Sequence, residues 1–76
     1  MSRKLPQLTP VRVERALLKA GFVLRRIKGS HHHYKHPDRP EFLVTVPFHT
    51  GTVPSGLLGK IVKDAALTRS QFRDFL

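Results

Sequence analysis

The chain has 76 residues, too few for more than one small domain with a limited core. It contains no cysteine, which excludes disulfides and thiolate metal sites, and no apolar run of the about 20 residues needed to span a bilayer. Fourteen Lys and Arg against five Asp and Glu give a formal net charge of +9, which favours nucleic acid or a strongly acidic protein as the partner over a membrane surface.

Residues 1–8 are expected to form an N-terminal arm. They hold no signal-peptide core, and together with the absence of cysteine this predicts a cytoplasmic protein. A helix is predicted to begin at Thr9-Pro10, with Thr9 as N-cap, and to end before Gly21. Its apolar residues recur at helical spacing, at Val13, Ala16, Leu17 and Ala20.

Three strands joined by short turns are predicted next. The first covers residues 22–27, with Leu24 on one face and Ile27 on the other. Gly29-Ser30 forms the turn into a second strand over residues 31–35. The turn at residues 37–40 holds two prolines and leads to a third strand over residues 41–46.

Side chains alternate along a strand, so the second strand has two different faces. Tyr34 is expected to pack inward together with His32, while His31, His33 and Lys35 point outward.

A loop over residues 48–54 carries His49 and precedes a second helix, for which Ser55 is the predicted N-cap. Thr68 and Gln71 form a capping-box pattern, which begins a short helix in the tail, residues 68–76. The element order predicts a single α+β domain over residues 1–76. In it a three-stranded antiparallel sheet carries the helices on one face and leaves the other open.

Four of the five histidines lie within residues 28–37, next to several cations. Imidazole can exchange a proton near pH 7, and the cations attract phosphate. This combination favours chemistry on RNA.

Three motifs in the chain resemble those of the HicA/YcfA family of toxin–antitoxin mRNA interferases. They are Gly29-Ser30-His31-His32-x-Tyr34-x-His36-Pro37, Val44-Thr45-Val46-Pro47-x-His49-x-Gly51 and Gly56-x-Leu58-x-x-Ile61. The likeness runs from the first helix to Leu67. It departs from the common pattern at Ala66, where many members have glycine, and at Leu57, where threonine is common.

The resemblance implies a double-stranded-RNA-binding-domain-like fold and metal-independent cleavage of mRNA that depends on the histidine at His31. It also implies a HicB-like antitoxin that covers this site, and the charge of the chain predicts that this partner is acidic.

His31 is then the candidate general base, which takes the proton of an RNA 2′-OH and leads to a 2′,3′-cyclic phosphate. The cations around it are expected to bind RNA phosphate, together with backbone N–H groups of the turn. These candidate phosphate-binding residues are Arg25, Arg26, Lys28, Gly29, Ser30 and Lys35.

His49 is the second catalytic candidate, as general acid for the leaving 5′-oxygen, although a surface loop histidine is an equally good interpretation. His32, His33 and His36 are expected to be bystanders.

Two alternatives compete with the nuclease. His31 and His33 share a face and suit zinc, but no third strong ligand is evident, so no metal or cofactor is expected. The other alternative is a non-catalytic RNA-binding module of the same fold, in which the basic residues only contact phosphates.

Overall fold

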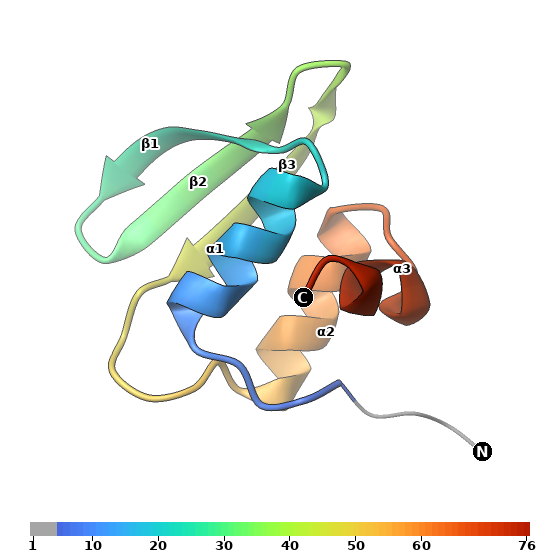
Figure 1. The fold of residues 1–76 in the computed structure, drawn as a ribbon. Helices are drawn as coiled ribbons and strands as arrows, with labels where there is room; N and C mark the ends of the chain where they lie inside the picture. The colour runs from blue at the N-terminus through green and yellow to red at the C-terminus, as the bar shows by residue number, and fades with distance from the viewer. Residues whose placement is uncertain (1–4) are drawn as a thin grey trace.

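A computed structural model describes residues 5–76 and shows the α+β arrangement expected from the sequence (Figure 1). The elements are α1 (Pro10–Lys19), β1 (Val23–Lys28), β2 (His31–His36), β3 (Arg39–Pro47), α2 (Ser55–Asp64) and α3 (Arg69–Asp74). The strands form one antiparallel sheet in the order β1-β2-β3. Helix α1 packs against β1 and β3, α2 packs against β3, and the short α3 packs against α2.

One apolar core lies between the helices and the inner face of the sheet. Its largest fully buried side chains come from every layer of the molecule. They are Tyr34, Phe72, Leu17, Leu58, Ile61, Val13, Val44 and Val46. Leu8 is also buried, and its carbonyl accepts the Val53 N–H at 2.7 Å, so this part of the predicted arm belongs to the core. Residues 1–4 of the predicted arm lie outside the described residues.

The ends of α1 are those predicted. The Thr9 hydroxyl accepts the Arg12 N–H, and Pro10 occupies the first helical turn, where its missing N–H is not needed. Gly21 follows the C-cap Ala20 with φ +100°. The positive φ favours glycine at this position, and a Cβ there would also come within 2.8 Å of His36 Nε2, so the His36 ring would have to shift.

The ends of the other two helices were predicted in part. The capping box of α3 is confirmed, because Thr68 and Gln71 each bond to the other's backbone N–H. The predicted N-cap Ser55 is wrong: Pro54 is the N-cap of α2, and Ser55 is its first helical residue. Ala66, just beyond α2, has φ +59°, a left-handed conformation that costs an alanine about 1–2 kcal/mol.

The alternation predicted for β2 is confirmed, since Tyr34 is buried and His31 is exposed. The opposite faces predicted for Leu24 and Ile27 are wrong. A register shift between Leu24 and Arg26 places Leu24 opposite Tyr34 and Ile27 opposite His32, so both lie on the inner face. Such a bulge changes which residues face outward beyond it.

The turn before β3 is shorter than predicted. It consists of Pro37 and Asp38 alone, and β3 already begins at Arg39 and includes Pro40. Because β3 is an edge strand, a proline without an N–H can be accommodated there.

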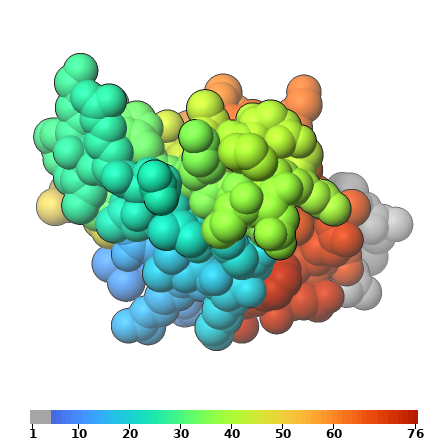
Figure 2. Space-filling model, turned by 90° about the horizontal axis from the view of Figure 1, so that it is seen from above, coloured from blue at the N-terminus to red at the C-terminus, as the bar shows by residue number. Residues whose placement is uncertain are grey.

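β1 is the least covered strand, and all six of its residues are exposed. Together with the β1–β2 turn it lies on the opposite side of the molecule from α3 (Figures 1 and 2). Among residues 5–76, no helix has the length and apolarity that crossing a bilayer would require.

Candidate active site on the open sheet face

His31 stands at the start of β2 on the open face of the sheet, where its side chain is exposed. It lies between Lys28 of β1 and Pro47 of β3 in the strand register. The rings of His33 and His49 lie nearly edge-on to it, with centroids 6.5 Å and 6.4 Å away. The structure therefore places the loop histidine His49 close to His31, which the sequence alone does not indicate.

The other histidines of this stretch have different surroundings. His33 Nδ1 lies 2.8 Å from the Thr45 hydroxyl, so its ring is fixed against β3. His36 lies at the far end of β2, where Nδ1 accepts the Asp38 N–H at 3.2 Å and the ring packs edge-on against Phe22. His36 therefore supports the β2–β3 turn and is separate from the His31 group.

The predicted phosphate-binding cations flank these histidines. Arg26 lies opposite His33 and Lys28 opposite His31, while Lys35 follows on the same open face. With Arg25 at the bulge, Arg26 and Lys35 line a hollow of about 330 Å³ beside His33. Within residues 5–76, none of these four cations forms an ion pair, so they remain available to bind phosphate.

The two turn residues predicted to bind phosphate, Gly29 and Ser30, directly precede β2. Gly29 has φ +60° and nothing within 4 Å of the position of a Cβ, so its side of the turn is open. Ser30 is half-buried, and its carbonyl accepts the Phe48 N–H at 2.6 Å.

A groove of about 520 Å³ extends from His31 and His49 across the edge of β3 toward α2. Its walls are mostly apolar, with an ion pair of 2.6 Å between Lys60 and Asp64 on α2. The remaining lining residues are Leu43, Thr45, Pro47, Pro54, Leu57 and Ile61. A concave, largely apolar surface with a few polar groups is typical of a ligand site.

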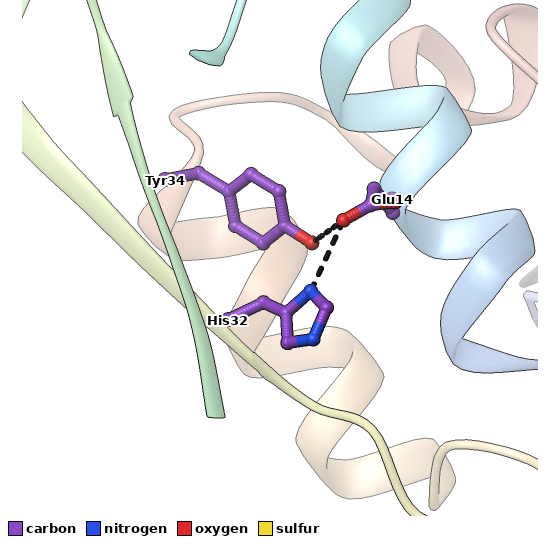
Figure 3. Close-up of polar contacts among 3 residues, drawn as sticks. All are labelled: Glu14, His32 and Tyr34. Atoms are coloured by element: carbon purple, nitrogen blue, oxygen red, sulfur yellow. Dashed lines mark hydrogen bonds and ion pairs between the residues drawn. The ribbon is translucent and has the colours of Figure 1, made fainter. Parts of the chain in front are cut away.

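A second group of polar residues lies beneath this surface, on the inner face (Figure 3). Glu14 of α1 accepts the Tyr34 O–H at 2.5 Å, and the same carboxylate oxygen lies 3.2 Å from His32 Nδ1. Burial raises the pKa of the Tyr34 phenol far above its usual value, and the bond to Glu14 raises it further, so the phenol stays protonated.

The ring of His32 continues this group toward the loop after β3. It stacks on Phe48, with ring centroids 3.6 Å apart and planes 12° from parallel. Because Phe48 directly precedes His49, the inner-face contacts hold the backbone beside that histidine.

A family model described as the HicA toxin of bacterial toxin–antitoxin matches residues 12–67. The chain belongs to the HicA toxin family. It is therefore a toxin of a toxin–antitoxin system, in a family whose members generally cleave mRNA, and an antitoxin is its partner. No curated protein matches the chain.

The matched part of this HicA toxin contains both histidines of the candidate site and the inner-face group. Sequence reasoning missed Glu14 and Phe48 in that group. For Glu14 a signal was present, because it is one helical turn from Pro10 and Leu17 and thus lies on the stripe of α1 that is buried. For Phe48 there was none, since its role depends on its stacking against His32, which is 16 positions earlier in the chain.

The two departures from the family pattern have structural consequences in this HicA toxin. Ala66 adopts the left-handed conformation for which glycine is favoured. Leu57 lines the groove that begins at His31, so this part of the groove is more apolar than it would be with threonine. Over residues 5–76, no three His, Asp or Glu side chains are gathered closely enough to hold a metal ion.

Proposed function

We propose that this HicA toxin is an endoribonuclease that cleaves single-stranded mRNA in the cytoplasm, with His31 as general base and no metal in the chemical step. The observation that carries the proposal is an exposed imidazole on a sheet face whose cations form no ion pair among residues 5–76, with a second imidazole 6.4 Å away. A nuclease needs such access, since RNA must reach the base from solvent.

His31 would accept the proton of the 2′-OH through a ring nitrogen. The 2′-oxygen then attacks the adjacent phosphorus and forms a 2′,3′-cyclic phosphate. This cleavage step needs no water molecule as nucleophile, because the RNA 2′-OH attacks the phosphorus. A positioned base of this kind contributes about 10²–10⁴ in rate.

His49 would donate its proton to the 5′-oxygen as the bond from that oxygen to phosphorus breaks, which releases a free 5′-OH. The attacking and leaving oxygens lie on opposite sides of phosphorus, so the base and the acid must be separated. Each ring needs to be within about 2.6–3.2 Å of its own oxygen. Ring centroids 6.4 Å apart are compatible with a phosphate between His31 and His49.

Lys28 and the hollow lined by Arg25, Arg26 and Lys35 supply the positive charge for the phosphates on either side of the cut. Together with the N–H groups of Gly29 and Ser30, they would also stabilise the charge that develops on the transferred phosphate.

The antitoxin is proposed to be an acidic, HicB-like protein that covers the His31 face. The toxin carries a formal net charge of +9, and the cations of its open face have no acidic partner among residues 5–76. An acidic partner there would neutralise the charge and exclude RNA from His31.

The experiment is induced expression of the parent, His31→Ala and His36→Asn in a bacterial host, with growth and message integrity followed over time. His36 is the matched control, because asparagine can still accept the Asp38 N–H in place of Nδ1. We expect growth arrest and mRNA cleavage from the parent and His36→Asn, and neither from His31→Ala.

Equal toxicity of His31→Ala and the parent would remove the catalytic role of His31. Purified toxin should also cleave single-stranded RNA in EDTA; cleavage that disappears with EDTA would contradict the metal-free mechanism. RNA binding without any cleavage by the parent would favour the binding module.

A further inference from the structure

Both histidines of the proposed active site have a neighbour in the chain that belongs to the inner-face group. His31 is followed by His32 on β2, and His49 is preceded by Phe48. His31 points to the open face, whereas His32 points inward toward Glu14, because neighbouring side chains of a strand alternate. The inner-face residues can therefore affect the site without touching the RNA.

A continuous line of contacts joins α1 to the His49 loop beneath the sheet (Figure 3 shows its first part). The Glu14 carboxylate bonds Tyr34 and His32, and the His32 ring stacks flat on Phe48. The backbone N–H of Phe48 also donates to the Ser30 carbonyl, directly before His31. Phe48 is thus held by its ring and by its backbone.

We propose that His32, held by Glu14, is a positioning residue that orients His49 as the general acid by stacking on Phe48. The inference rests on the proposed ribonuclease function and assigns a role to a histidine that the chemistry itself does not use.

The loop that carries His49 has little regular structure of its own. Residues 48–54 lie between β3 and α2 outside any helix or strand, and Gly51 has φ +88°. The end of this loop near α2 is held against the segment before α1, because the Val53 N–H donates to the Leu8 carbonyl. The end near His49 is held at Phe48 by two contacts, the backbone bond to Ser30 and the ring stack on His32. Without the stack only the backbone bond remains, so His49 would be less firmly oriented. Loss of orientation of a reacting group reduces the rate even when the group itself is present.

The experiment compares two RNA substrates of the same sequence. One has the natural 5′-oxygen at the cut, and the other has sulfur in its place. A thiolate leaves without being protonated, so the sulfur substrate does not need a general acid. The variants are His32→Asn and Phe48→Ala, with His49→Ala and His31→Ala as references. His32→Asn keeps an N–H donor for Glu14 but removes the stacked ring, which limits its effect on the fold.

We expect His32→Asn, Phe48→Ala and His49→Ala to cleave natural RNA at least about 10²-fold more slowly than the parent. All three should cleave the sulfur substrate at nearly the parent rate. His31→Ala should be slow on both substrates, because each needs the base. Phe48→Tyr, which keeps a ring over His32, should remain active on natural RNA.

Two results would overturn the inference. Parent-like cleavage of natural RNA by His32→Asn and Phe48→Ala would show that the contacts do not position the acid. If His32→Asn and Phe48→Ala lose the same factor in cleavage rate on both substrates, these residues only support the fold. By contrast, parent-like cleavage of natural RNA by His31→Ala would contradict the proposed function itself, so the two failures are distinguishable.

Discussion

Replacing Glu14 by alanine is the most informative test of the inner-face group. Tyr34 is only 1% exposed and would lose its acceptor, since no other partner bonds its hydroxyl among residues 5–76. A hydrogen bond to a charged group contributes about 1.5–3 kcal/mol. His32 is more exposed than Tyr34 and can turn to water, so it adds less. Glu14→Ala should therefore lower the free energy of unfolding by about 2–4 kcal/mol.

The assay is urea unfolding at pH 7. Fluorescence of Tyr34 reports the transition directly, because the chain has one tyrosine and no tryptophan. With a urea m-value of about 1 kcal/mol/M for a chain of this size, the midpoint should fall by about 2–4 M. Glu41→Ala is the matched control, since Glu41 is exposed, and it should stay within about 0.5 kcal/mol of the parent. If Glu14→Ala unfolds at the same urea concentration as Glu41→Ala, the group contributes nothing to stability.

Three further features of the structure, at Ala66, Tyr34 and Lys28, can each be tested separately. Ala66→Gly should stabilise the fold by about 0.5–1 kcal/mol and raise Tm by about 2–8 °C, because Ala66 has φ +59°. Ala20→Gly, at a right-handed helix end, should lower Tm instead, and a lower Tm for Ala66→Gly would contradict the backbone argument. Above pH 10 the unfolded state loses the tyrosine proton while folded Tyr34, with its raised pKa, keeps it, so stability should fall by about 1.4 kcal/mol per pH unit. Tyr34→Phe should reduce this slope in alkaline unfolding experiments, and an unchanged slope would assign it to other groups. Lys28→Gln should make the log–log salt dependence of single-stranded RNA binding shallower by about 0.7, whereas Lys19→Gln on α1 should leave it unchanged; equal slopes for both would remove Lys28 from the RNA surface.

The parts of the fold that could be predicted from the sequence are those set by local chemistry. The starts of α1 and α3 depend on a hydroxyl at Thr9 or Thr68 and on the residues next to it in the chain. The outward position of His31 follows from alternation within one short strand that has no bulge before Tyr34.

The parts that could not be predicted depend on pairing and packing between distant segments. The bulge after Leu24 arises when β1 meets β2, and it moves Ile27 to the inner face. The approach of His49 to His31 depends on the bond between Phe48 and Ser30, which are 18 positions apart. In both cases the residues that are neighbours in the sequence do not indicate the contact, because its partner lies in a distant segment.

The most direct test of the whole account is the rate at which purified His31→Ala cleaves a single-stranded RNA, compared with the parent at pH 7. The rate of His31→Ala should be at least about 10²-fold lower, with 2′,3′-cyclic phosphate ends formed by the parent and an unchanged Tm for the variant. A folded His31→Ala that cleaves RNA as fast as the parent would contradict it.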